Sequence, residues 1–261
     1  MARRNGFTLI ELVMVIVLLG IVSIVSVRFV SLSTLGSLDT SARQLRSLQA
    51  VVISEQITRE LREAFPLSVR TSGACLEWLP LGAGTNYLNL TSGPGFDEIE
   101  IAPFAQIPGV GSTRAVVYGY GTSTPTATEL YSGADPGPVS ETIDSIDNGA
   151  SPATITLSGS HQFSATSPAR RLFVIGQPVS LCQSGRFLHR YSGYAPASSQ
   201  PTPPAGTPEI LAANLTGTVD FNFQPATLQR AAVVQFTFEL ANDDATETTT
   251  VSQEVQIRNV P

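Results

Sequence analysis

The chain has 261 residues, of which 42% are hydrophobic and only 14% charged, and its formal net charge is −6. Phosphate binding needs a surplus of cationic side chains, so this charge argues against a nucleic-acid partner. The length allows one large or two small domains. Ser, Thr, Gly and Pro are abundant beyond the first seventy residues, which is typical of an exported, β-rich domain with long loops.

The N-terminal segment is apolar over residues 7–27, apart from Glu11. About twenty residues make roughly 30 Å of helix, which is enough to span a bilayer. A secretory signal would have a shorter apolar run and a small-residue cleavage site, and the pair Arg3–Arg4 alone is a weak indication of a twin-arginine signal. We therefore favour a retained membrane helix. Arg3 and Arg4 then hold the N-terminus in the cytoplasm, and the rest of the chain lies outside.

Glu11 is the unusual residue in this segment. A carboxylate at membrane depth costs about 2.5–3.5 kcal/mol on insertion scales, so it needs a reason to be there. The stretch Gly6-Phe-Thr-Leu-Ile-Glu11 resembles the processing site of type IV prepilins and type II secretion pseudopilins. Its parts are a basic leader, a glycine, a hydrophobic residue and a glutamate at the fifth mature position.

The resemblance implies how these residues act. A membrane-embedded aspartyl peptidase would cut after Gly6, remove residues 1–6 as a leader, and N-methylate the new terminus at Phe7. Glu11 would then meet the N-terminal amine of a neighbouring subunit in the filament. Such a pair attracts strongly in a low-dielectric helix bundle, whereas either charge alone is penalised. Glu11 is thus expected to set the register of assembly.

The helical pattern continues beyond the membrane segment. Apolar residues recur at spacings of mostly three to five until Pro66, which stops a helix because it lacks the N–H group. They are Leu38, Ala42, Leu45, Leu48, Val52, Ile57, Leu61 and Phe65. We expect one helix over residues 7–66, transmembrane in its first half and amphipathic in its second. In pilins the second half packs under a sheet, so the resemblance implies an α+β fold with an antiparallel, β-rich domain over residues 67–261.

The domain after Pro66 shows short strand patterns separated by loops. Strands are predicted at residues 74–79, 98–102, 114–120, 153–157, 171–175, 178–183, 186–191, 219–224, 232–240 and 248–258. Gly185 sits at the turn of a predicted hairpin. Residues 121–152 and 195–208 are rich in Pro, Ser and Gly, and they are expected to be loops of low order. We find no internal repeat.

The two cysteines, Cys75 and Cys182, are far apart in sequence. In an oxidising compartment a disulfide is the natural interpretation, and two buried thiols are the alternative. A disulfide that closes a loop of about 100 residues contributes up to roughly 4.7 kcal/mol in the chain-entropy model.

The sequence contains no recognisable catalytic pattern and predicts no cofactor. It has no nucleophile elbow, P-loop or complete dinucleotide fingerprint. The two histidines, His161 and His189, lack the close pairings of a zinc site and the spacing of a catalytic triad. Residues 144–149 are similar to the start of a calcium loop, but Ile146 fills a ligand position and Ile155 stands where the closing glutamate belongs. We therefore predict neither an enzyme nor a metal site.

Four further blocks, at residues 57–70, 75–80, 189–194 and 255–261, resemble the MshO-type minor pilins of MSHA pili, which are related to J-type pseudopilins. The expected function is that of a structural minor pilin held in the bacterial inner membrane and then built into a pilus. The implied partners are the prepilin peptidase and methyltransferase, other major and minor pilins, the assembly platform and the lipid bilayer. A type II secretion pseudopilin is the first alternative, and an anchored exported enzyme or binding module is the second.

Overall fold

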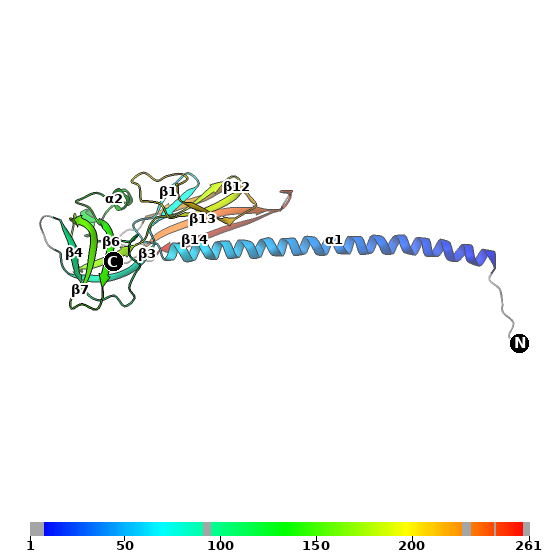
Figure 1. Ribbon diagram of the computed structural model, residues 1–261. Coiled ribbons are helices and arrows are strands. Elements are labelled where there is room, and N and C mark those ends of the chain that lie inside the picture. Colours follow the sequence, from blue (N-terminus) through cyan, green and yellow to red (C-terminus); the bar gives the residue numbers. More distant parts are fainter. Residues whose placement is uncertain (1–7, 91–94, 226–230, 243, 258–261) are drawn as a thin grey trace. The chain divides into compact units, whose positions relative to one another are not determined.

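A computed structural model describes residues 8–90, 95–225, 231–242 and 244–257 (Figure 1). Its first element is the 54-residue helix α1, Leu9–Arg62, which begins where Leu12 N donates to Thr8 O at 3.2 Å. One stretch of this helix is long and apolar enough to cross a membrane, with a mean hydropathy of 2.8. Residues 1–49 form one unit and residues 50–261 a second, compact unit.

The helix ends at Arg62, four residues before the proline that was expected to stop it. Backbone pairing draws the following residues away from the helical path. Ala64 forms an isolated antiparallel bridge with Pro80, and Phe65 N donates to Leu79 O at 2.8 Å. The end of α1 is thus set by pairing with a segment that follows β2, and not by Pro66 alone.

A five-stranded antiparallel sheet holds both cysteines. Its order is β1 (Arg70–Ser72), β2 (Cys75–Trp78), β9 (Val179–Ser184), β10 (Phe187–Ser192) and β11 (Thr207–Ala212). The predicted hairpin is confirmed, because β9 and β10 pair directly and Gly185 has a φ of 57° in the turn between them. Glycine adopts this left-handed conformation without the steric cost that a Cβ imposes.

A second sheet has three long strands, β12 (Leu215–Gln224), β13 (Ala232–Ala241) and β14 (Thr248–Ile257). Buried residues alternate with exposed or half-buried ones along β12 and β13, as expected for a sheet with one face on the core. Gln183 of the first sheet joins β12, since its Oε1 accepts from Val219 N at 2.7 Å and its Nε2 donates to Gly217 O at 2.8 Å.

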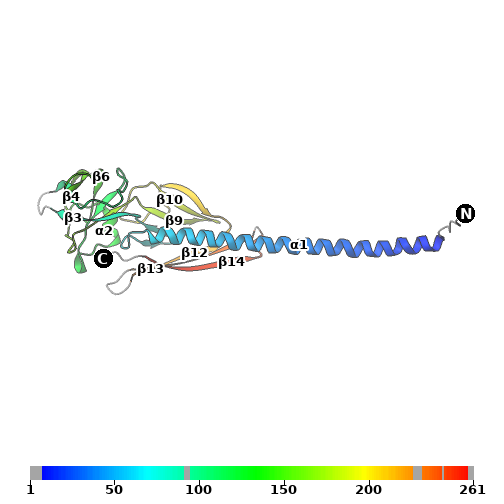
Figure 2. The same cartoon turned by 90° about the horizontal axis from the view of Figure 1, so that it is seen from below.

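Both sheets bury apolar side chains against the last part of α1. Seen from below, β9 and β10 lie on one side of this helical part, and β13 and β14 on the other (Figure 2). The shared core includes Ile57, Leu61, Leu76, Trp78, Phe236 and Phe238, all of them almost fully buried. The last turns of the helix thus find apolar partners in two sheets at once. The predicted apolar stripe is buried only in part, because Leu38, Leu45, Leu48 and Val52 are exposed.

The remaining six strands form a closed barrel. They are β3 (Leu81–Asn89), β4 (Phe96–Ile101), β5 (Arg114–Val116), β6 (Val139–Asp147), β7 (Ala153–His161) and β8 (Arg171–Ile175), in the order β3-β4-β7-β6-β5-β8. The barrel has its own apolar core, which includes Ile99, Ile101, Ile143, Ile155 and Leu172. All six strands lie between β2 and β9 in the sequence. The barrel is therefore an insertion into the five-stranded sheet.

The prediction of a low-order loop over residues 121–152 is wrong. This stretch contains a 3-10 turn (Gly121–Ser123), the short helix α2 (Ala127–Ser132) and strand β6. Helix α2 begins with a capping box, in which Thr126 and Glu129 bond to each other's backbone N–H, and Gly133 closes it with a φ of 62°. These local signals specify a helix inside a segment whose Pro, Ser and Gly content suggests a loop.

The expected α+β architecture is confirmed, with one long N-terminal helix and a domain built from antiparallel sheets. Four strands escaped prediction, namely β1, β3, β6 and β11. β3 contains two glycines and little apolar alternation, and β11 lies in a stretch that includes Pro208. The second predicted loop, residues 195–208, gives way to β11 at Thr207.

Candidate processing and assembly site

Glu11 lies in the first turn of α1, and the structure describes no other charged residue before Arg28. Its neighbours are exposed apolar side chains, with Leu9 at 82% exposure and Ile10 at 70%. A surface of this kind is stable only in lipid or against other apolar helices. The predicted processing residues Arg3, Arg4, Gly6 and Phe7 lie outside the described residues.

The first unit of the chain offers apolar surface along most of its length. Residues 8–45 are all exposed, and the membrane-length window has no buried share. Charged side chains are sparse here, with Arg28 and Asp39 separating the apolar part from the amphipathic part. Glu11 thus lies among exposed apolar side chains at the start of α1.

Cys75 and Cys182 are joined by a disulfide, and their Cα atoms lie 4.2 Å apart. The two residues are direct cross-strand partners on β2 and β9. Gln183 N donates to Ala74 O at the preceding position of the ladder, which makes the cysteine pair a narrow, non-hydrogen-bonded one. Because Leu76 and Trp78 point into the core with α1, Cys75 and Glu77 lie on the opposite face of the sheet.

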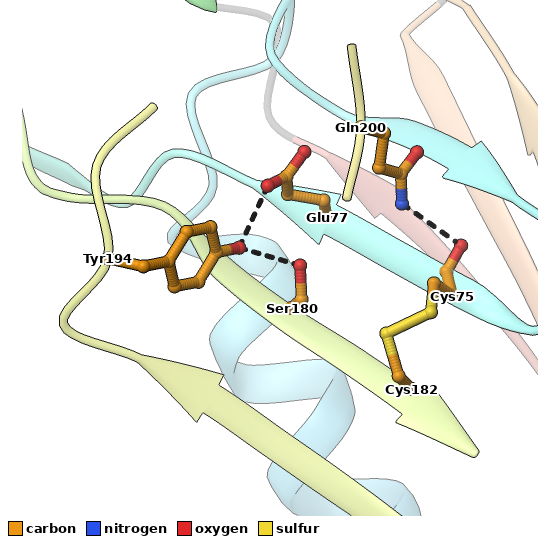
Figure 3. The surroundings of a disulfide bond; sticks show 6 residues. All are labelled: Cys75, Glu77, Ser180, Cys182, Tyr194 and Gln200. Atoms are coloured by element: carbon orange, nitrogen blue, oxygen red, sulfur yellow. Dashed lines mark hydrogen bonds between the residues drawn. A yellow bond between two sulfur atoms is a disulfide. The ribbon is translucent and has the colours of Figure 1, made fainter. Parts of the chain in front are cut away.

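A buried polar cluster occupies that opposite face (Figure 3). Glu77 is fully buried, and Tyr194 OH donates to its Oε1 at 2.8 Å. Ser180 Oγ lies 2.6 Å from the same phenol oxygen. The other carboxylate oxygen of Glu77 pairs with Arg70 Nε. Burial is the main reason why the pKa of Tyr194 lies well above its usual value, so the phenol is held as a donor.

Arg70 also contacts two segments outside the sheet. Its Nη1 donates to Ser198 O at 2.8 Å, and its Nη2 donates to Ala197 O at 2.7 Å. The guanidinium lies 3.7 Å from the ring centre of Tyr131, on helix α2 of the inserted part. One arginine therefore ties the loop after β10 and helix α2 to β1. Its donors are used within the protein, which indicates a role in holding the structure and not in catalysis.

Glu77, Arg70 and Tyr194 were not predicted from the sequence as functional or structural centres. A usable signal was present, since Glu77 stands inside the apolar run Cys75-Leu-Glu-Trp-Leu. A carboxylate in such a run calls for a buried partner. That partner comes from residues far away in the sequence, and no local pattern indicates it.

The other candidate residues lie in structural positions. His161 is buried, with Nε2 3.2 Å from Gly137 O and Nδ1 3.5 Å from Asp135 Oδ1. Asp147 ends β6, and its Oδ1 accepts from Gly149 N and Ala150 N in the turn that leads to β7. Among the described residues, no three His, Cys, Asp or Glu side chains gather closely enough to hold a metal ion.

In the comparison with known proteins, the N-terminal segment matches a family model. Residues 1–27 match the prokaryotic N-terminal methylation motif. This is the motif of the type IV pilin and pseudopilin class, and it implies processing by a prepilin peptidase. No curated protein and no solved structure shows significant similarity to the chain. The matched segment includes Gly6, Phe7 and Glu11.

Proposed function

We propose that the chain is a structural minor pilin that is built into an MSHA-like type IV pilus. One observation carries this proposal: a methylation motif over residues 1–27 leads directly into an uninterrupted helix whose N-terminal part is apolar and exposed. An enzyme held by a simple anchor has no use for a processing glycine followed by a glutamate in the membrane. A filament subunit uses both.

The proposal assigns a step to each residue of the motif. The peptidase cuts between Gly6 and Phe7, and Phe7 becomes N-methylphenylalanine. Phe7 and Glu11 are four residues apart, or about 6 Å along a helix. A subunit therefore carries an amine and a carboxylate at different depths, and the carboxylate of one subunit meets the amine of another. The pair stabilises assembled subunits and leaves separate ones with an uncompensated charge.

The same proposal fixes the parts of the chain and their locations. Residues 1–6 are the cleaved leader, residues 7–66 contain the assembly helix, and residues 67–261 form the exported domain. Arg3 and Arg4 keep the leader in the cytoplasm, so the domain enters the periplasm and then the pilus. Its partners are the prepilin peptidase and methyltransferase, other major and minor pilins, the inner-membrane assembly platform and the bilayer.

A J-type minor pseudopilin of a type II secretion system is the alternative within the same class. The methylation motif and the long helix are common to minor pilins and pseudopilins, so they do not distinguish the two. A deletion strain separates the two functions. Loss of a minor pilin reduces or alters the surface pili seen by electron microscopy, whereas loss of a pseudopilin leaves the pili and stops the secretion of exported enzymes. The MSHA assignment rests on the resemblance of residues 57–70, 75–80, 189–194 and 255–261.

The processing step gives the direct test. Gly6→Leu should leave an uncut, membrane-held precursor, because a side chain at that position crowds the scissile backbone. Gly20→Leu is the matched control, since a Cβ at Gly20 meets no atom within 4 Å and the residue lies in the same apolar segment. The readouts are size on a gel and the mass of the N-terminal peptide with its methyl group. A mature, methylated chain from Gly6→Leu would contradict the proposal.

A further inference from the structure

Strand β14 presents a long open edge. It is the last strand of its sheet and pairs with β13 over all ten of its residues, without a register shift. Among the described residues none pairs with its outer edge. Its sequence, TTTVSQEVQI, has one charged residue and neither proline nor lysine. Edges of this kind readily accept another strand, and proteins usually protect them.

The hydrogen-bond pattern shows which groups face outward. Asn242 N donates to Glu247 O at 3.1 Å just beyond the strands, whereas Ala241 N donates to Asn214 O on the side of β12. Bonding directions alternate along an antiparallel strand. The odd-numbered residues of β14 therefore bond to β13, and the even-numbered ones direct N–H and C=O away from it. Thr248, Thr250, Ser252, Glu254 and Gln256 are all exposed.

The other sheet borders are protected. The barrel is closed, which removes its edges. β11 at the far border of the five-stranded sheet has six residues, includes Pro208 and is irregular in its pairing with β10 near Leu188. β1 is only three residues long. β12, the ten-residue strand at the other border of the β14 sheet, has a register shift between Thr216 and Asp220, and Gln183 bonds to its Val219 N and Gly217 O. Among the described strands, β14 is thus the one long edge without such a feature.

The direction of β14 limits what can add to it. It runs along the last part of α1 and points the same way (Figure 1). Its final residues, Gln256 and Ile257, line a hollow with Arg62, where α1 ends. Antiparallel pairing of β14 with β14 of a second copy requires a two-fold axis across the strands. That axis would reverse the direction of the last part of α1 in the second copy, whereas subunits built into one filament share a single direction of this helix.

We propose that β14 accepts an antiparallel strand from a different exported subunit of the same assembly. The proposal rests on the proposed function, because the shared helix direction comes from assembly into one filament. The incoming strand runs opposite to the last part of α1. On the core side it places apolar side chains beside Val251, Val255 and Ile257, of which the last two are buried. On the outer side it faces Thr250, Ser252 and Gln256, so hydroxyl or amide side chains fit there.

The first experiment compares amide exchange in the wild-type chain, purified in detergent and assembled in native filaments. Strand addition protects the amides of Thr250, Ser252, Glu254 and Gln256 in the assembled form by about tenfold or more, while those of the odd-numbered residues are protected in both forms. Fast exchange of the even-numbered amides in assembled material would overturn the proposal. This measurement needs no variant.

The second experiment compares Ser252→Pro with Ser252→Ala. Both lose the hydroxyl that accepts from Thr237 Oγ1 at 3.1 Å, but only proline removes an outward N–H, and it leaves the bonds to β13 in place. Cleavage after Gly6 and the unfolding midpoint of the purified chain should be alike in both variants. Recovery in the assembled fraction should fall at least about fivefold for proline only.

Two results would overturn the strand assignment without touching the proposed function. One is equal recovery of processed Ser252→Pro and Ser252→Ala chains. The other is crosslinking of two differently tagged copies of this chain through a photoreactive residue at Thr250, which would identify the partner as a second copy. Failure of cleavage and methylation in the wild-type chain would instead reject the proposed function itself.

Discussion

The phenol of Tyr194 donates a 2.8 Å hydrogen bond to the carboxylate of Glu77, a side chain with no exposed surface. The carboxylate belongs to β2, and the phenol follows β10. With Arg70 on β1, the pair forms an ionic cluster on the sheet face opposite the helix. Removing one partner of a buried charge is costly because the other is left unsatisfied.

Tyr194→Phe should therefore lower the free energy of unfolding. A hydrogen bond to a charged group contributes about 1.5–3 kcal/mol, so a loss in this range is expected from urea denaturation. Tyr120→Phe is the matched control, because Tyr120 is 42% exposed and its substitution should change stability little. Equal midpoints for the two variants would show that the Tyr194 hydroxyl has no such role.

Alkaline pH should destabilise the domain. Burial raises the pKa of Tyr118 to about 12, and it raises the pKa values of Tyr131 and Tyr194 above their usual range. In the unfolded chain a tyrosine ionises near pH 10. The stabilisation is thus complete below about pH 10 and is lost as the pH rises through the folded-state values. The ultraviolet absorbance of tyrosinate should report three late-titrating groups, and Tyr194→Phe should remove one. A single transition of all six tyrosines near pH 10 would contradict this.

The disulfide should contribute strongly to stability. Cys75 and Cys182 are 107 residues apart in sequence, and a loop of about 100 residues corresponds to roughly 4.7 kcal/mol in the chain-entropy model. Replacing both cysteines with serine should lower the unfolding free energy toward that amount. The wild-type chain should also become less stable in reductant, whereas the double variant should not respond. Free thiols in the purified native protein would refute the pairing.

Glu11→Ala should separate insertion from assembly. Insertion should be intact or improved, because a costly charge is gone, and cleavage after Gly6 should survive. Incorporation should fail, since a neighbour's amine loses its partner. Glu11→Gln should fail nearly as much, and Glu11→Asp should retain part of the function. Incorporation of each variant is measured by the recovery of mature chain with its pilin partners from solubilised membranes.

Asp39→Ala supplies the control for that experiment, because Asp39 is another exposed acid on α1 and lies outside the motif. It should be recovered with the partners as well as the wild-type chain is. Equal recovery of Glu11→Ala and Asp39→Ala would show that Glu11 has no pairing role.

The sequence predicts the helix well because its signals are local. A long apolar run, a helical stripe up to Phe65 and the following Pro66 all lie within one continuous segment. The hairpin at Gly185 is local in the same way. The end of α1 is different, because the pairing of Ala64 with Pro80 depends on the approach of a later segment.

The barrel was not foreseen because closure is a property of six strands together. Several of its strands contain Gly, Thr and Ser, whose β propensity depends on packing and cross-strand neighbours. Its first strand, β3, shows no clear alternation of apolar residues. The cluster around Glu77 escaped for a related reason, since Arg70, Glu77 and Tyr194 meet only after both β2 and β10 are in place.

The inserted barrel also has a mechanical consequence. The chain leaves for the barrel after Trp78 and returns at Val179, and these two residues are paired neighbours on β2 and β9. A pulling force on the barrel would peel the two strands apart from that end, pair by pair. After Trp78, Glu77 and Leu76 have parted from their partners, the next pair is Cys75 with Cys182. Beyond that point the load passes through a covalent bond, and the sheet under the barrel stays closed.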